Sequence, residues 1–112
     1  MPTIDKTTFE ELKQMSGEDF INELIDTFLE DAPKMIEEIK AALDSNNVDA
    51  FRRAAHSMKS NAATFGAGQL AELAKELEMF GKENKLHETG DRLKALEEAY
   101  ASVRDELKGL KS

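Results

Sequence analysis

The chain of 112 residues contains no cysteine, which excludes a disulfide framework, a thiolate metal site and a cysteine nucleophile. This absence fits a reducing compartment. No run of about 18 apolar residues occurs, so no transmembrane helix is predicted. The start of the sequence lacks a basic segment followed by an apolar stretch, which argues against a secretion signal. We therefore expect a cytoplasmic protein without a membrane partner.

Glycine and proline are scarce, with six and two residues, whereas 40% of the residues are hydrophobic and 34% are charged. This composition excludes the disordered and collagen-like classes. The length suits one ordinary domain with a single core. We expect residues 1–112 to form one domain, and we expect a monomer because the apolar residues are accounted for by one core.

Basic residues are outnumbered by acidic ones, 15 against 23, and the net charge of −8 repels nucleic acid and anionic lipid. The acids are unevenly spread, because residues 50–71 hold Arg52, Arg53 and Lys59 but no aspartate or glutamate. On charge alone, this segment is as consistent with a helix that happens to lack acids as with a surface that tolerates an anion. We expect no nucleic-acid partner.

Motifs for nucleotide and metal binding are missing as well. Neither Gly-x-x-x-x-Gly-Lys-Ser/Thr nor Gly-x-Gly-x-x-Gly occurs, which leaves no site for ATP or a dinucleotide, and autonomous kinase activity is not expected. The residues three positions before His56 and His87 are Arg53 and Asn84, so the Glu-x-x-His pairs of di-iron bundles are absent. We expect no metal site and no cofactor of the chain's own.

Strand signals are nearly absent, whereas apolar residues recur at helical spacing in several segments. The spacing predicts a short helix over residues 5–14 and then a long helix with a capping box at Ser16 and Asp19. A proline inside a helix kinks or breaks it, and here we expect a kink near residues 29–32, because the apolar phase continues past Pro33. Its inward stripe is predicted at Phe20, Leu24, Phe28, Ala32, Met35, Ile39 and Leu43.

Three further helices are predicted. The first is capped by Asn47 and ends at Gly66, and the last carries a bundle seam from Leu93 to Leu110. The helix between them is predicted to stop at Gly81. Its inward-facing residues are predicted to be Leu70, Leu73, Leu77 and Phe80. Residues 82–91 are expected to hold one helical turn at most, and the Glu/Lys run of residues 74–85 is interpreted as a solvated face. The predicted fold class is all-α, an antiparallel four-helix bundle with a short additional N-terminal helix.

His56 is predicted to lie on the exposed face of its helix. The apolar stripe of that helix consists of Phe51, Ala55, Met58, Ala62 and Phe65. A neutral imidazole on a solvated face can attack phosphorus directly. Lys59, one turn further on, lies close enough for its ammonium to offset the charge of a phosphoryl group on His56. His87, in a polar loop, is interpreted as a solvated bystander.

The segment around His56 resembles the signature of histidine-containing phosphotransfer (HPt) domains. That pattern has a histidine, a lysine three positions on, a small residue four on and a glycine ten on, which His56, Lys59, Ser60 and Gly66 match. Many members of the family have Gly-Ser after the lysine, whereas this chain has Ser60 and Asn61. This departure leaves the mechanism intact and bears on hydrogen bonding to the phosphoryl group.

The resemblance implies a phosphocarrier in a multistep two-component relay, a phosphotransfer intermediate that forms a phosphohistidine. His56 would accept a phosphoryl group from the aspartate of one response-regulator receiver domain and pass it to another, in a relay fed by a hybrid histidine kinase. Mg²⁺ would be supplied by the receiver. Residues expected to support the site or dock the receiver are Arg52, Ser57, Ser60, Ala63, Gly66 and Gln69.

Two alternatives stay open at this point. A non-catalytic helical adaptor would bind a receiver or a partner helix without being phosphorylated. A metal-binding bundle is a third interpretation, and it has less support because the usual ligand spacings are missing.

Overall fold

Helices account for all the regular secondary structure in residues 4–111, the part of the chain that the computed structural model describes. The expected all-α class is therefore confirmed. A short 3₁₀ helix, η1 (Leu86–Glu88), is the single helical turn allowed for residues 82–91. The α-helices are α1 (Lys6–Ser16), α2 (Glu18–Asp44), α3 (Val48–Thr64), α4 (Gly68–Lys82) and α5 (Arg92–Leu110).

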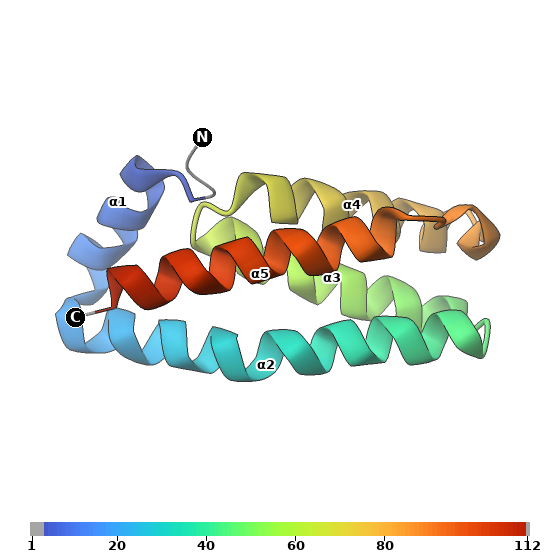
Figure 1. The fold of residues 1–112 in the computed structure, drawn as a ribbon, viewed down its shortest axis with the longest axis horizontal. Helices are drawn as coiled ribbons and strands as arrows, with labels where there is room; N and C mark the ends of the chain where they lie inside the picture. The colour runs from blue at the N-terminus through green and yellow to red at the C-terminus, as the bar shows by residue number, and fades with distance from the viewer. Residues whose placement is uncertain (1–3, 112) are drawn as a thin grey trace.

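The four longer helices lie lengthwise in a body of 41 × 25 × 20 Å, and each reverses the direction of the one before it (Figure 1). Helix α3 makes its most extensive contacts with α4 and packs on α2 as well, whereas α5 packs mainly on α4. Helix α1 crosses one end of the molecule (Figure 1). The interface between α3 and α4 is therefore the most extensive helix–helix contact among the described residues.

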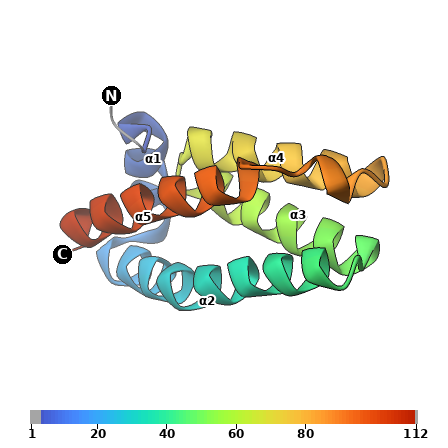
Figure 2. The same cartoon turned by 45° about the vertical axis from the view of Figure 1, so that its right-hand side comes forward.

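Helix α2 is unbroken, and it curves smoothly instead of showing the kink expected at Pro33 (Figure 2). It runs without interruption from Glu18 to Asp44 with Pro33 inside it, and Figure 2 shows a smooth curve. An interior proline costs about 3 kcal/mol. Buried side chains on both sides of it, such as Phe28 and Ile36, each contribute roughly 1.5–3 kcal/mol, so packing outweighs the cost.

The buried stripe of α2 agrees with the predicted one at Phe28, Ala32 and Ile39 and is rotated from it elsewhere. Phe20 was expected to face inward, but it is 50% exposed. Leu24, Met35 and Leu43 are only partly buried. The helix buries instead Ile21, Ile25, Phe28, Ala32, Ile36, Ile39 and Ala42. Apolar residues occupy adjacent positions along α2, so the spacing allowed either phase and tertiary packing selected this one.

The helix ends follow one prediction and overturn another. The side chain of Asn47 accepts a hydrogen bond from the backbone N–H of Ala50 at 3.1 Å, which confirms it as the cap of α3. Ser16 was expected to cap α2, but it is the last residue of α1, and Gly17 holds the cap position without a side-chain bond. The capping box at Ser16 and Asp19 was therefore wrong.

Gly66 lies just after the end of α3, where the sequence predicted the helix to stop. It also joins the N-terminal segment to the α3–α4 turn through a backbone hydrogen bond. Its φ of +78° lies in the left-handed region, which favours glycine. The backbone N–H of Asp5 donates to the Gly66 carbonyl at 2.9 Å. A Cβ at this position would lie 2.9 Å from the Cβ of Thr8, so glycine also permits the close approach of α1.

An aromatic cluster joins three helices at the centre of the core. The ring of Phe28 in α2 lies 5.3 Å from that of Phe65, just after α3, and 5.9 Å from that of Tyr100 in α5. Burial raises the pKa of the Tyr100 hydroxyl. These contacts hold the lengthwise helices together on the side of α3 that faces away from His56.

Candidate functional site

His56 lies on the exposed face of α3, as predicted. Its side chain is 58% exposed. All five residues of the predicted apolar stripe, Phe51, Ala55, Met58, Ala62 and Phe65, are buried. The local periodicity of α3 therefore places the imidazole on the surface by default, because the opposite face is committed to the core.

Glu78 of α4 connects His56 with Lys59. One carboxylate oxygen, Oε2, lies 2.8 Å from Nδ1 of His56, and the other, Oε1, accepts a hydrogen bond from Nζ of Lys59 at 2.6 Å. The Glu78 side chain is only 6% exposed. Nζ of Lys82, one turn further along α4, lies 4.0 Å from Oε2. The histidine and the lysine of the predicted motif are thus joined by a buried carboxylate.

The sequence reasoning missed Glu78, because the Glu/Lys run of residues 74–85 was interpreted as a solvated face. That interpretation is wrong at this residue. Glu78 lies in helical register with Leu70, Ala74 and Leu77, which are all buried. The sequence did contain an indication of this burial, because Glu78 is a charged residue in phase with an apolar stripe. A charged side chain at such a position needs a partner for its charge.

Gly81 brings α3 and α4 close enough for the contact between His56 and Glu78. It was predicted to stop α4, but the helix continues to Lys82, and Gly81 is buried inside it. A Cβ at Gly81 would lie 3.1 Å from the Cβ of Arg52 and 3.3 Å from its Cα. Glycine is therefore needed at this position for close helix packing rather than for termination.

The Glu78 carboxyl is ionised at neutral pH. Burial by itself raises its pKa, but hydrogen bonds from Lys59 and His56, together with their charges, outweigh burial, and the pKa falls below the ordinary value of 4.5. An ionised carboxylate can only accept hydrogen bonds. Nδ1 of His56 must therefore carry the proton of their contact, and in the neutral ring the free lone pair lies on Nε2.

Cationic side chains surround the histidine. A hollow of about 430 Å³ beside the imidazole is lined by Arg52, Arg53, His56, Ser57, Glu78 and Lys82. Arg52 is paired with Asp49 at 3.4 Å; the Asp49 side chain is exposed and that of Arg52 is partly exposed. With Lys59 on the other side of Glu78, the cations outnumber the single buried carboxylate. The hollow beside the imidazole can therefore accept an anion.

The structure separates the other predicted site residues into two groups. Arg52 and Ser57 line the hollow with His56. Ser60 and Ala63 are exposed on later turns of α3. Helix α3 ends about 12 Å along its axis from His56, Gly66 follows that end, and exposed Gln69 is the second residue of α4. The α4 residue that contacts the histidine is Glu78, not Gln69.

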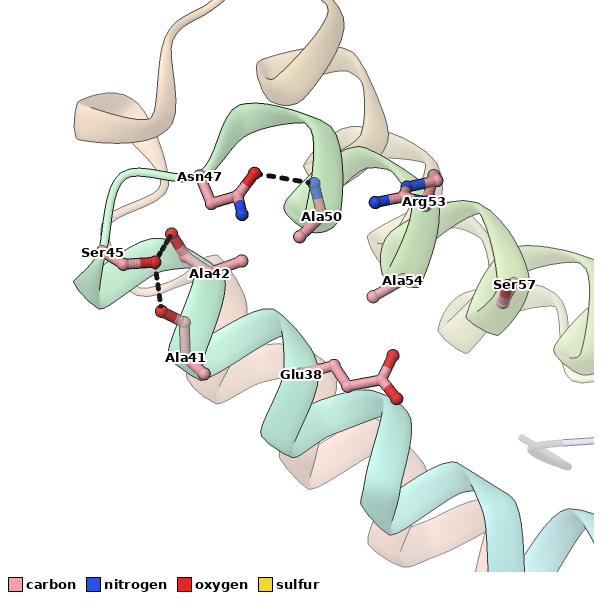
Figure 3. Close-up of a pocket in the computed structure, with 9 residues that line it drawn as sticks. All are labelled: Glu38, Ala41, Ala42, Ser45, Asn47, Ala50, Arg53, Ala54 and Ser57. Carbon is pink, nitrogen blue, oxygen red and sulfur yellow. Dashed lines mark hydrogen bonds between the residues drawn. The ribbon is translucent and has the colours of Figure 1, made fainter.

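A second hollow adjoins the first on the α2 side. It has a volume of about 470 Å³ and lies between the end of α2 and the start of α3 (Figure 3). Arg53 and Ser57 line both hollows. The other walls are mostly small side chains, Ala41, Ala42, Ser45, Ala50 and Ala54, with Glu38 and Asn47. The surface next to His56 on the α2 side therefore has few bulky side chains, and a partner's surface can approach it closely.

Two features are absent from residues 4–111. No three side chains of His, Cys, Asp or Glu are grouped there so that they could hold a metal ion. None of the helices in this range combines the length and the apolar character needed to cross a membrane.

Comparisons with known proteins converge on one family. Residues 23–106 match the family described as "Hpt domain". The phosphorelay protein LuxU of Vibrio harveyi is 31% identical over 87 residues, which cover 78% of this chain and 76% of LuxU. The crystal structure of histidine-containing phosphotransfer protein B (HptB) from Pseudomonas aeruginosa PAO1 superposes with a TM-score of 0.92. That match is 28% identical and covers 98% of this chain and 95% of HptB. A chain with this site and these relatives belongs to the Hpt domain family.

Proposed function

We propose that this chain is a phosphocarrier in a multistep two-component phosphorelay, with His56 as the phosphorylated nucleophile. The observation that carries the proposal is the exposed imidazole whose Nδ1 is engaged by buried Glu78 at 2.8 Å, which leaves Nε2 free to attack. Membership of the Hpt domain family and the likeness to a protein described as a phosphorelay protein support it.

The partners are receiver domains of response regulators and of a hybrid histidine kinase. A receiver aspartyl phosphate delivers its phosphoryl group to His56, and a second receiver aspartate accepts it. Mg²⁺ and most of the transition-state stabilisation come from the receiver, because in-line phosphoryl transfer needs mainly positioning and charge neutralisation. The chain supplies no cofactor and does not act as a kinase by itself.

Lys59 offsets part of the charge of the phosphoryl group. Its side chain is 31% exposed, and its Nζ is held at 2.6 Å by Glu78 in the free chain, so it is already beside the imidazole. Receiver docking uses the exposed rim around His56, including Arg52, Ser57, Ser60 and Ala63 of α3. Gly66 supports this surface through the α3–α4 turn, and Gln69 lies at the far edge of the docking area.

The finer description of the fold belongs to the same proposal. Helices α2 to α5 form an antiparallel four-helix bundle, and α1 is the short additional helix at its end; the alternating helix directions in Figure 1 support this description. The chain works as one monomeric domain in the cytoplasm. A monomer presents His56 to one receiver at a time, as sequential transfer requires.

The test is phosphorylation by receivers. The chain, its His56→Gln variant and its His87→Gln variant are mixed in turn with several phosphorylated receivers and Mg²⁺, and intact mass is measured. His87 is the only other histidine in the sequence, which makes its variant the matched control. We expect one acid-labile phosphoryl group on the wild type and on His87→Gln, and none on His56→Gln.

The opposite result would favour a different role. If several receivers bind the wild type but none charges it, the chain is an adaptor that engages receivers without phosphorylation. If His56→Gln is charged as readily as the wild type, the nucleophile is another residue and the proposal fails.

A further inference from the structure

We propose that Glu38 of α2 and Arg53 of α3 determine which receiver this chain accepts, by binding a cationic and an anionic side chain of the partner on opposite walls of the α2–α3 groove. This groove is the hollow of about 470 Å³ between the end of α2 and the start of α3 (Figure 3). The inference rests on the proposed function and deepens it, because it states the charges that the partner must carry near its aspartate.

The two side chains have opposite charges and line the same groove without pairing with each other. Figure 3 shows Glu38 on the α2 wall and Arg53 on the α3 wall, with no hydrogen bond between them. Within residues 4–111, Glu38 forms no ion pair, and the Arg53 side chain donates only from Nε to the backbone oxygen of Asp49, at 3.4 Å. Both side chains are exposed. The carboxylate and most of the guanidinium donors therefore stay available to a partner.

The groove between the two charges offers no competing charge. Among the described residues that line it, Glu38 and Arg53 are the only charged ones, and the others are mostly alanine and serine. Small side chains let a partner's surface come close enough for its own charged groups to reach both walls. A charge on a wall of this kind interacts with the partner rather than with neighbours on the same chain.

The groove is continuous with the hollow around His56. Arg53 and Ser57 line both, and Arg53 precedes His56 by three residues, about 4.5 Å along the helix axis. A protein interface of ordinary size covers about 800 Å² on each partner, which is a disc of about 16 Å radius. Asn47, at the far end of the groove, lies about 13.5 Å from His56 along α3. A receiver centred on His56 therefore covers the groove.

The α2 side of the docking area has one uncompensated acid. Glu38 also lines a third hollow, of about 270 Å³, together with Asp31, Lys34 and Met35 of α2 and Ser57 of α3. Lys34 lies one turn from Asp31 and offsets its charge there. Glu38 therefore carries the net negative charge of this wall.

The α3 side has the opposite charge. Arg52 is paired with Asp49 at 3.4 Å, whereas Arg53 has no carboxylate partner among the described residues. The docking area is thus acidic on α2 and basic on α3. A receiver with the complementary arrangement gains two ion pairs, and a receiver with the reverse arrangement meets like charges at both positions, which selects against it.

Two single reversals and their combination separate the arrangement of the charges from their sum. Glu38→Arg and Arg53→Glu shift the net charge in opposite directions, and the double variant has the wild-type net charge of −8 with the arrangement reversed. Rapid-quench kinetics measures transfer from a phosphorylated receiver as a function of receiver concentration. We expect each single variant to raise the half-saturating concentration roughly threefold to tenfold, and the double variant to raise it at least as much.

The rate at saturating receiver gives the second readout. For Glu38→Arg we expect this rate to change less than about twofold, because the groove acts on docking and not on the bond that is transferred. The matched control is Glu37→Arg, the same change at the next position, where the carboxylate lies 3.8 Å from Nζ of Lys40 and lines none of the three hollows. It should leave both quantities at the wild-type values, and circular dichroism checks that every variant is folded.

Two outcomes would overturn the inference. If the double variant returns to the wild-type half-saturating concentration, only the total charge of the surface matters. If none of the three variants differs from Glu37→Arg, the groove lies outside the interface.

Reversal of charges on the receiver identifies the partner groups directly. Exposed lysines and arginines around the receiver's aspartate are changed to glutamate one at a time and tested with wild type and Glu38→Arg. We expect one reversal to weaken docking on wild type and to bring Glu38→Arg back to within about twofold of the original pair, as coupled residues do in a double-mutant cycle. The absence of any such position would contradict the inference.

Failure of the proposed function would look different. If receivers bind the chain but none phosphorylates it, the relay role is lost, and equilibrium titration of the same variants with an unphosphorylated receiver still reports whether the groove selects it. If receivers phosphorylate the wild type and all the variants equally well, the relay role stands and the role of Glu38 and Arg53 is refuted.

Discussion

Glu78 is a buried carboxylate that contacts both His56 and Lys59. An ionised group taken out of water loses several kcal/mol of solvation unless partners replace it. Here Lys59 and His56 donate to its two oxygens at 2.6 and 2.8 Å, and Lys82 stands nearby. The ionised carboxylate is therefore stabilised in the folded chain by Lys59 and His56. The free energy of unfolding consequently depends on residues of the site.

The depressed pKa of Glu78 predicts a loss of stability in acid. Because its pKa is lower in the folded than in the unfolded chain, the group stabilises the fold above its ordinary value of 4.5. That contribution is lost as the pH falls through the folded value. We expect the free energy of unfolding, measured with urea, to decline more steeply below this range for wild type than for Glu78→Gln. Glu76→Gln should keep the wild-type slope, and equal slopes for all three would show that Glu78 is not stabilised in this way.

Lys59 supplies a second prediction at this scale. Lys59→Ala removes the cation nearest to the phosphoryl group and one donor to Glu78, so we expect transfer from a phosphorylated receiver to slow by about tenfold, or about 1.4 kcal/mol of transition-state free energy. Lys59→Arg retains the charge and should recover most of the rate. The measurement is rapid-quench kinetics, with Lys75→Ala, an exposed lysine of α4, as control. An unchanged rate for Lys59→Ala would remove Lys59 from the site.

At the scale of the helix, α2 contains an interior proline, and packing against the core keeps the helix continuous. Pro33 lies in the interior of the helix, on its exposed side. It offers no N–H to the carbonyl four residues earlier and its ring crowds that carbonyl. The helix nevertheless continues, because buried side chains such as Phe28, Ala32 and Ile36 fix both halves against the rest of the core.

Replacing this proline should therefore stabilise the protein. Pro33→Ala restores the missing hydrogen bond without touching the core, and we expect a gain of about 1 to 3 kcal/mol in the free energy of unfolding. Urea unfolding followed by far-UV circular dichroism measures it, and phosphorylation of His56 should be unaffected. A loss of stability would mean that the curvature of α2 at Pro33 is itself required for packing.

At the scale of the whole molecule, the aromatic cluster of Phe28, Phe65 and Tyr100 connects three helices. Phe28 contributes from α2 at ring distances of 5.3 and 5.9 Å to the other two. A contact that joins three elements is lost only when they separate, so it supports cooperative unfolding.

Two phenylalanines of α2 provide a matched comparison. Phe28→Ala should cost about 3–5 kcal/mol, the usual range for a fully buried phenylalanine. Phe20→Ala should cost less than about 1 kcal/mol because its ring is 50% exposed. The midpoints of urea unfolding give both values. Similar costs at the two positions would mean that the inward face of α2 is the one first predicted from the sequence.

Features that depend on local spacing along the chain could be predicted from the sequence. The sequence predicted the helix cap at Asn47, the buried stripe of α3 and the exposure of His56. Each of these features depends on residues within a few positions of one another. Where two local patterns competed, the prediction failed: adjacent apolar positions in α2 left its phase open, and a serine and a glycine next to each other left the α1–α2 boundary open.

What the sequence by itself determined is therefore the helical class and the face on which His56 lies, because helical periodicity is set by near neighbours along the chain. Only the tertiary structure decided the partner of that histidine. Glu78 is 22 positions away, and its contact depends on the register of α4 against α3 and on the close approach that Gly81 permits. Such a register is set by side-chain packing between helices, which no spacing within one helix encodes.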